Sequence, residues 1–226
     1  MLLLVIDTSG RNGSVALARA GTAHEEVEIV GSLALSGGTF SAQLVPQIAD
    51  LLKSHQLVKS DVDGFIVVSG PGSFTGLRVG LAAIKALAEV LQKPIVPVSL
   101  LEILAIAACK EGRIASALDA GRGQVYLGQF EVTGSSAHLV EQGLVLKTQM
   151  PDVVRGVIFA TTDPSLAGVA RQAAVEVVEI EAIHPRMIAA FGWSRLNAGT
   201  IVSAEQLDAN YIRRSDEIFG KPVSGS

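Results

Sequence analysis

The apolar run Gly64–Ser69 constrains the fold more than any other feature, because it leads into a glycine block and a long apolar helical pattern. A short run that is apolar almost throughout is typical of a strand in a sheet covered by helices on both faces. In the helical pattern, Gly76–Leu91, the only charged residues are Arg78, Lys85 and Glu89, which share one narrow stripe. A surface helix usually exposes about half of its circumference. We therefore predict an α/β fold in which this helix packs on its own sheet with one side and on a partner protein with the other.

Strand and helix patterns follow one another in a similar order in the two halves of the chain. Each half opens with antiparallel strands and then alternates strands with helices. In the first half, a hairpin turn at Asn12–Gly13 is predicted to join the first two strands. The predicted strands are Met1–Ile6, Ser14–Arg19, Glu25–Leu35, Gly64–Ser69, Pro94–Val98, Ile114–Leu118, Arg122–Val132, His138–Lys147, Gly156–Thr161 and Val175–Ile180. This order predicts two related subdomains, residues 1–100 and a smaller 101–226, each with a mixed sheet flanked by helices. We expect the C-terminal segment to pack back on the first subdomain.

The glycine block contains Gly70, Gly72, Gly76 and Gly80 but matches neither of the common phosphate-binding motifs. A Walker A loop needs Lys followed by Ser or Thr after its last glycine, where this chain has Leu77. A Rossmann fingerprint has one residue fewer between its second and third glycines. Two interpretations stay open. The glycines let an anion approach the helix N-terminus, or they provide a sharp turn and close packing.

Few side chains in the sequence have the spacing that catalysis or metal binding requires. Asp7 and Asp119 each end an apolar strand and open a glycine-containing loop, so each is either a turn former or a Mg²⁺ ligand through water. The four histidines lack metal-binding spacing. Cys109 lies in an alanine-rich helical pattern, where we expect a small buried side chain. The net charge of -4 argues against nucleic-acid binding by the chain alone, and no apolar run approaches the roughly 20 residues of a membrane span.

Five motifs together resemble the TsaB (YeaZ) family over essentially the whole chain. They are "IDTS" at 6–9, "SAQLVPQI" at 41–48, "GPGSFTGLRVG" at 70–80, "DAGRGQVY" at 119–126 and "NYIRRSD" at 210–216. The resemblance implies two subdomains of the actin-like ATPase fold and an inactive relative of the catalytic protein TsaD. The catalytic relatives bind a metal through an H-x-x-x-H pair on their first helix, and the corresponding stretch here, "TFSAQLVPQI", has no histidine. The resemblance therefore implies no metal site and no catalytic residue in this chain.

The function that the resemblance implies is a role in forming N6-threonylcarbamoyladenosine at position 37 of tRNAs that read codons beginning with A. A protein of this family is expected in the cytoplasm, away from membranes, as a homodimer in isolation and as a heterodimer with TsaD. It works with the small ATPase TsaE, and tRNA meets it indirectly through the complex. The chain itself requires no cofactor in this interpretation, whereas ATP or ADP and Mg²⁺ act in the complex.

Two sets of candidate site residues follow from the motifs and from the resemblance. A vestigial nucleotide or phosphate loop is expected at Asp7, Thr8, Ser9, Gly70, Gly72, Ser73, Gly76 and Asp119. A partner interface is expected on the two N-terminal helices, at Leu44, Ile48, Leu77, Leu81 and Ile84 or their neighbours, with Arg78 and Lys85. The sequence does not decide which of these residues face inward. Two other functions stay open: a stand-alone actin-like ATPase or phosphotransferase with Asp7 and Asp119 around Mg-nucleotide, and a metallopeptidase, for which no metal ligands are evident.

Overall fold

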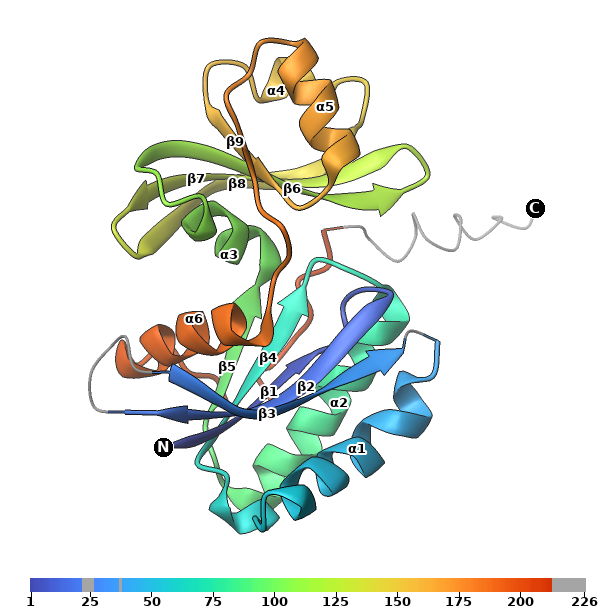
Figure 1. The fold of residues 1–226 in the computed structure, drawn as a ribbon, viewed down its shortest axis with the longest axis vertical. Helices are drawn as coiled ribbons and strands as arrows, with labels where there is room; N and C mark the ends of the chain where they lie inside the picture. Colours follow the sequence, from blue (N-terminus) through green and yellow to red (C-terminus); the bar gives the residue numbers. More distant parts are fainter. Residues whose placement is uncertain (22–26, 37, 213–226) are drawn as a thin grey trace, which may run out of the picture. The chain divides into compact units, whose positions relative to one another are not determined.

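The computed structural model describes residues 1–21, 27–36 and 38–212 of the chain, which divides into two compact units (Figure 1). Unit 1 consists of residues 1–103 and 183–210, and unit 2 contains residues 104–182 together with residues 211 and 212. Unit 1 therefore extends past the predicted boundary at residue 100. Unit 1 also includes residues 183–210 from the C-terminal part of the chain, among them the helix α6 (Pro185–Asn197).

The sheet of unit 1 has five strands among the described residues, in the order β3-β2-β1-β4-β5. They are β1 (Leu2–Asp7), β2 (Asn12–Ala20), β3 (Val27–Ser36), β4 (Gly64–Gly70) and β5 (Ile95–Ser99). β1, β2 and β3 form an antiparallel meander, whereas β4 pairs parallel with both β1 and β5. Parallel neighbours need crossover connections, which α1 (Phe40–Ser54), the short 3-10 turn η1 (Lys59–Asp61) and α2 (Phe74–Leu91) provide.

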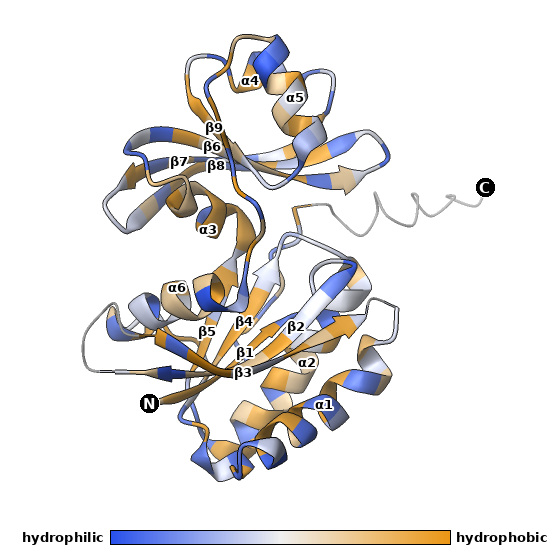
Figure 2. Cartoon of the chain, in the orientation of Figure 1, coloured by the Kyte–Doolittle hydropathy of each residue, from blue (hydrophilic) through white to orange (hydrophobic). Residues whose placement is uncertain are grey.

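Helices cover both faces of this sheet: α1 and α2 lie on one face and α6 lies on the other (Figure 1). The sequence explains this arrangement, because β4 is buried at every residue and needs apolar neighbours on both sides. Much of the central strands is hydrophobic, whereas α1 carries hydrophobic and hydrophilic residues on different sides (Figure 2). The structure confirms the predicted α/β sheet covered on both faces.

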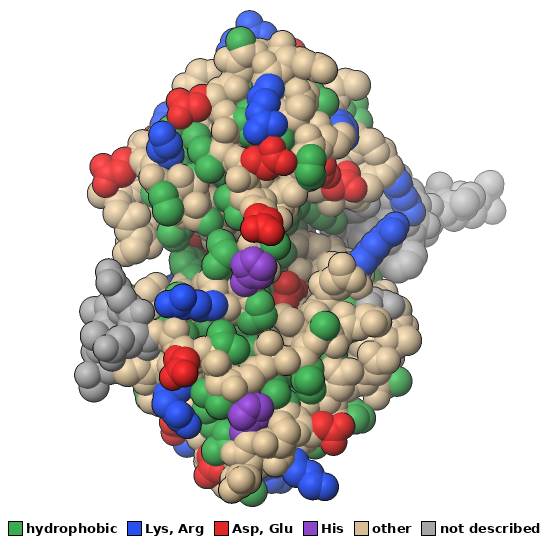
Figure 3. Space-filling model, viewed as in Figure 1, with side chains coloured by type: hydrophobic (Ala, Val, Ile, Leu, Met, Phe, Trp, Pro, Cys, Tyr) green, Lys and Arg blue, Asp and Glu red, His purple; other side chains and the backbone are tan. Residues whose placement is uncertain are grey.

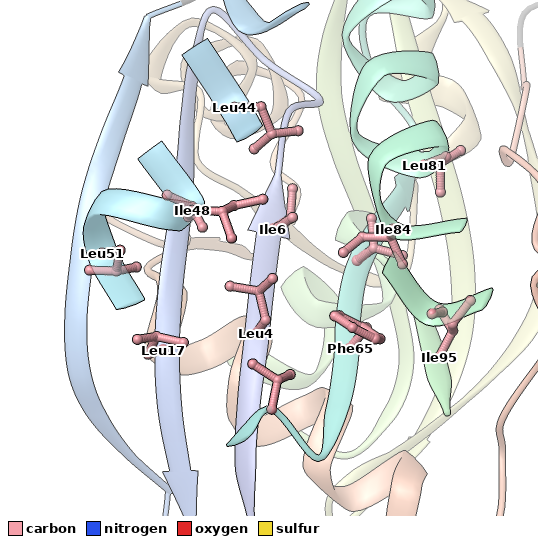
Figure 4. Packing of buried hydrophobic residues seen from close by; sticks show 14 of the residues in the cluster. Leu4, Ile6, Leu17, Leu44, Ile48, Leu51, Phe65, Leu81, Ile84 and Ile95 are labelled. Atoms are coloured by element: carbon pink, nitrogen blue, oxygen red, sulfur yellow. The ribbon is translucent and has the colours of Figure 1, made fainter. Parts of the chain in front are cut away.

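The core between the sheet and α1 and α2 is built from aliphatic side chains and two phenylalanines, Phe40 and Phe65; Figure 4 shows part of it. Leu44, Ile48 and Leu51 come from α1, Leu81 and Ile84 from α2, and Leu4, Ile6, Leu17, Phe65 and Ile95 from the strands. Residues three and four positions apart share one side of a helix, so a single stripe of each helix enters this core.

Unit 2 repeats the strand order of unit 1. Its sheet is β10-β9-β6-β7-β8 among the described residues, with an antiparallel meander β6–β7–β8 and with β9 and β10 parallel to β6. The elements are α3 (Leu100–Ala107), which leads in from unit 1, β6 (Gly112–Gly121), β7 (Gln124–Thr133), β8 (Ser136–Leu146), α4 (Met150–Val153), β9 (Ile158–Thr161), α5 (Pro164–Gln172) and β10 (Val177–Glu179). The shared order confirms the duplicated arrangement that the sequence predicts.

Two local predictions need correction, and one element was not predicted. β1 and β2 form the predicted antiparallel hairpin, with Asp7 opposite Ser14, but Asn12 and Gly13 also pair with β3 as the first residues of β2 and do not form a two-residue turn. Gly13 lies against the Phe40 ring, where a Cβ would not fit. Cys109 follows the end of α3 in a left-handed conformation with φ 51° and is exposed, because the helix stops before it. The short helix α4 was not predicted. The motif at 210–216 lies mostly outside the described residues, as does Glu25 of the predicted third strand.

Candidate functional site

The predicted nucleotide loop begins at Asp7, the last residue of β1. One oxygen of its half-buried carboxylate accepts hydrogen bonds from Ser9, from the backbone N–H at 2.8 Å and from the hydroxyl at 2.6 Å. Burial raises the pKa of the Asp7 carboxyl above its ordinary value, and the two bonds from Ser9 lower it by a smaller amount. The turn-forming role predicted for a strand-end aspartate is therefore present at Asp7.

Three glycines of the block bring α2 into direct contact with the loop after β1. A Cβ on Gly72 would overlap Ser9, a Cβ on Gly76 would overlap the backbone oxygen of Thr8, and a Cβ on Gly80 would overlap the Thr8 hydroxyl. Thr8 is buried, and its hydroxyl donates a hydrogen bond of 2.8 Å to the Gly76 carbonyl. Of the two interpretations of the glycines, close packing is visible in these contacts, whereas anion binding stays a prediction.

The start of α2 is tied to the same loop by Ser73. Its backbone N–H donates to the Ser9 carbonyl at 2.6 Å, and its hydroxyl accepts a longer bond of 3.3 Å from the Gly76 N–H, which caps the helix. Gly70, with φ 139°, lies close to the Asn210 backbone, so a side chain there would be both strained and crowded. Six of the eight predicted loop residues are thus joined by direct contacts around Thr8 and Ser9: Asp7, Thr8, Ser9, Gly72, Ser73 and Gly76.

The eighth residue, Asp119, lies in unit 2 near the end of β6 and is exposed. It pairs with Val125 of β7 across the turn that Arg122 and Gly123 form in left-handed conformations. This placement matches that of Asp7 in its own unit, since each aspartate stands at the end of the first strand of a meander. A shared nucleotide site for the two residues stays a prediction.

A hollow of about 500 Å³ lies where α1 and α2 both begin. Its lining includes Arg11 from the loop after β1, together with Ser41 and Thr75 from the first turns of the helices; the other lining residues are Gly10, Gly38, Phe40, Ser73, Gly76 and Val79. Backbone N–H groups at helix starts favour negatively charged groups, and Arg11 adds a positive charge. The hollow has the chemistry to accept a phosphate or a carboxylate.

The five apolar residues predicted for the partner interface are buried in unit 1 itself. Leu44, Ile48, Leu77, Leu81 and Ile84 are between 0 and 6 % exposed. They occupy the inward stripes of α1 and α2 and pack on the sheet, as Figure 4 shows for four of them. The prediction that these side chains contact a partner is corrected, because a partner would reach their neighbours on the outer side of each helix.

The two charged residues predicted for the interface lie nearer the surface. Arg78 is exposed, and its guanidinium stands 4.3 Å from the centre of the Phe74 ring on the first turn of α2. Lys85 is half-buried and lines a groove of about 820 Å³ between the second half of α2 and residues 201–206. Both positions can contribute to an interface on α2.

The outer side of α1 and α2 exposes a series of apolar residues that the sequence did not single out. We call this surface the outward face; it consists of Ala42, Val45 and Ala49 on α1 and Ala82, Ala86 and Val90 on α2. Val45 is 61 % exposed and Val90 71 % exposed. A signal was present, because the charged stripe with Arg78 and Glu89 marks the exposed side of α2, which Ala82 and Ala86 share.

Charged side chains of both signs are interspersed on the face of the molecule in Figure 3. That face carries no broad basic patch of the kind that grips a nucleic-acid backbone. In the part of the chain that the structure describes, no group of three His, Cys, Asp or Glu residues could hold a metal ion. The same part contains no helix that is both long and apolar enough to cross a bilayer.

Comparison with known proteins gives consistent matches. The family model of TsaD, described as tRNA N6-adenosine threonylcarbamoyltransferase, matches residues 35–150. The tRNA threonylcarbamoyladenosine biosynthesis protein TsaB of Bacillus subtilis is 33% identical over 172 residues, which are 74% of this chain and 73% of the relative. The Escherichia coli protein of the same name is 31% identical over 134 residues, 58% of this chain and 55% of that relative. YeaZ from Pseudomonas aeruginosa has a solved structure with a TM-score of 0.72 and 27% identity, covering 93% of this chain and 99% of that chain.

Two meanders of identical order, each continued by parallel strands and covered by helices, define a protein of the actin-like ATPase fold, as predicted. The identity to the Bacillus subtilis protein extends over most of both sequences, and the chain belongs to the TsaB family, which is related to TsaD.

Proposed function

We propose that this chain is a non-catalytic subunit of the machinery that forms N6-threonylcarbamoyladenosine at position 37 of tRNAs that read codons beginning with A. In this proposal it binds a TsaD protein as a scaffold and works together with TsaE. Its family membership and the names of its relatives in Bacillus subtilis and Escherichia coli, which are tRNA threonylcarbamoyladenosine biosynthesis proteins, support a role in this process. The outward face of α1 and α2 is the observation that supports a partner-binding role.

The outward face fits a protein interface better than a solvated surface. Neighbouring exposed apolar residues on one face of a soluble protein commonly mark a binding site. Alanines at Ala82 and Ala86 let a partner helix approach α2 closely, and the valines at Val45 and Val90 give it apolar side chains to cover. An interface of about 1,200–2,000 Å² in total would be of ordinary size. In the absence of TsaD, we propose that two copies of this chain pair through the same face.

Catalysis belongs to TsaD in this proposal. The chain requires no cofactor of its own, and ATP or ADP and Mg²⁺ act in the assembled complex. tRNA binds the complex and not this subunit alone, which agrees with the net charge of -4 and with the mixed charges in Figure 3.

The experiment is to place a charge on the outward face and measure binding to TsaD. Ala82→Glu and Ala86→Glu each put a carboxylate where the partner would bury it. An unpaired charge in an interface costs about 2 kcal/mol or more, so we expect the affinity to fall by roughly 30-fold or more. Ala173→Glu at the end of α5 is the matched control, because Ala173 is also an exposed alanine at a helix but lies in unit 2.

Calorimetric titration with purified TsaD gives the affinity, and a reconstituted tRNA modification reaction gives the function. Circular dichroism verifies that each variant is folded. We expect the two outward-face variants to lose both readouts and Ala173→Glu to keep both. Unchanged TsaD affinity of folded Ala82→Glu and Ala86→Glu would refute the outward face as the binding surface.

A further inference from the structure

The groove of about 820 Å³ in unit 1 borders the outward face at the C-terminal end of α2. We call it the α2 groove: one wall is the second half of α2, and the other is the segment 201–206 that follows α6. Glu89 and Gln92 line the groove, and Val90, the last residue of the outward face, stands between them in the sequence and is 71 % exposed. A protein that covers Val90 therefore reaches the rim of the α2 groove.

The second wall of the α2 groove is held in place by the chain itself. The Val202 N–H donates to the Ile95 carbonyl of β5 at 2.9 Å, and Leu207, just beyond the wall, is buried in the core. The Ser203 N–H donates to Gln206 Oε1 at 3.1 Å, and the Gln206 N–H donates to the Ser203 hydroxyl at 3.2 Å. The groove is thus formed before any partner arrives, which reduces the cost of ordering this segment on binding.

The exposed charges of the α2 groove are negative. Glu89 and Glu205 are exposed, and neither belongs to an ion pair with another residue that the structure describes. The last turn of α2 carries no basic residue to offset the negative end of the helix dipole. Of the two lysines in the lining, Lys93 lies 3.8 Å from the carboxylate of Asp63, and Lys85 is half-buried one turn before Glu89. This arrangement favours a basic side chain from a partner.

The α2 groove also continues the exposed apolar surface of the outward face. Ile201 lines the groove and is 50 % exposed, with Pro94 and Ala204 beside it in the lining. The outward face itself has six residues, four of them alanines, whereas an ordinary stable interface takes about 20–30 residues from each partner. A partner that binds the outward face must therefore contact more of unit 1, and the groove offers the apolar side chain of Ile201 next to two carboxylates.

We propose that the TsaD protein bound at the outward face inserts a basic and apolar segment into the α2 groove. A Lys or Arg side chain of that segment pairs with Glu89 and Glu205, and an apolar side chain covers Ile201. This inference rests on the proposed function, because it takes the same partner, and it adds a second contact with chemistry of its own.

Charge reversal tests the basic side chain. Glu89→Lys and Glu205→Lys are titrated with purified TsaD by calorimetry at about 50 mM and about 500 mM salt, because salt screens exposed charges. We expect each variant to bind roughly three- to tenfold more weakly than the parent at low salt, and the difference to shrink at high salt. Glu141→Lys is the matched control, because Glu141 is also an exposed carboxylate but lies on β8 of unit 2. It should keep the parent's affinity.

Truncation of Ile201 tests the apolar side chain. Ile201→Ala removes apolar surface that the partner would cover, so the affinity should fall roughly threefold at both salt concentrations. Val140→Ala is the control, because Val140 is 48 % exposed but lies in unit 2. Circular dichroism verifies that each variant is folded.

Ala82→Glu, measured alongside, separates the α2 groove from the outward face. If Ala82→Glu loses TsaD binding while Glu89→Lys, Glu205→Lys and Ile201→Ala keep the parent's affinity, the proposed function stands and the groove proposal is overturned. Tighter binding after charge reversal would mean that the inserted segment is acidic, and this result would overturn the proposal as well. A loss of equal size at both salt concentrations in the two Glu→Lys variants would do the same, because it assigns those residues a packing role. A parent protein that does not bind TsaD would end both proposals.

Discussion

Replacing Gly76 by alanine tests whether the glycine block serves close packing. The added Cβ would overlap the backbone oxygen of Thr8, which cannot rotate away as a side chain can, and it also threatens the Thr8–Gly76 hydrogen bond. Overfilling a packed site costs about 1–3 kcal/mol. Alanine's better helix propensity returns up to about 1 kcal/mol. We therefore expect a net loss of about 1–2 kcal/mol in the free energy of unfolding of unit 1.

Urea denaturation followed by tryptophan fluorescence measures this loss in the correct unit. Trp193 is the only tryptophan of the chain, it is 5% exposed, and it lies in α6 of unit 1. With a denaturant dependence of about 1–3 kcal/mol per molar urea, the midpoint should fall by roughly 0.5–1 M.

The matched control is the same substitution at Gly168 in the interior of α5. A Cβ there would meet no atom within 4 Å. Only the helix-propensity gain remains, so Gly168→Ala should stabilise unit 2 by about 0.5–1 kcal/mol, measured by far-UV circular dichroism. A Gly76→Ala protein with the parent's fluorescence midpoint would show that the contact with Thr8 does not constrain the structure.

Three further predictions concern unit 1. Asp7→Asn should stabilise the protein at neutral pH, because it removes a charge that is partly withdrawn from water while the amide oxygen still accepts the bonds from Ser9. Because the pKa of Asp7 is higher in the folded protein than its ordinary value of 3.8, the folded parent binds more protons than the unfolded chain at pH values between the two. The stability of the parent relative to Asp7→Asn should therefore increase as the pH falls from neutral through the folded pKa toward 3.8. Urea titrations that show the same stability difference at every pH would contradict this. Leu44→Ala should lower the free energy of unfolding by about 2–5 kcal/mol, because Leu44 is buried in the core. Val45→Ala should change the free energy of unfolding by no more than about 0.5 kcal/mol and weaken TsaD binding instead, because Val45 is exposed. If denaturation and titration experiments gave the reverse pattern, the side of α1 that carries Val45 would be the buried one, and the assigned orientation of α1 would be wrong. The purified chain alone should show no steady ATP hydrolysis; phosphate release that Asp7→Ala abolishes would favour a stand-alone ATPase.

The order of strands and helices was predictable because the strands carry strong, simple signals. The run Gly64–Ser69 and the first strand are apolar at nearly every position, and their burial on both faces follows from that. The repeat of the pattern in the second half predicts the second sheet, whose strand order is the same. Short elements such as α4 lack enough residues for a periodic pattern, and this explains why the sequence did not reveal it.

The orientation of α2 could not be derived from its apolar residues alone. That helix is apolar around most of its circumference, so hydrophobicity does not separate the inward Leu81 and Ile84 from the outward Ala82 and Ala86. Side-chain size separates these four residues, since Leu81 and Ile84 fill the core and Ala82 and Ala86 face out, but it does not hold along the whole helix, where Ala88 is buried and Val90 is exposed. The contact of Gly76 and Gly80 with Thr8 was equally hidden, because it joins segments that are far apart in the sequence.

Thr8 packs directly against α2, and no space is left between the two backbones, so the loop after β1 cannot shift toward the helix without displacing it. A ligand that pushed this loop would carry α2 with it, and Ala82 and Ala86 would travel by the same displacement. A ligand bound in the hollow beside Arg11 would thus displace a partner protein bound to the outward face of α2, because no flexible segment lies between the loop and the helix.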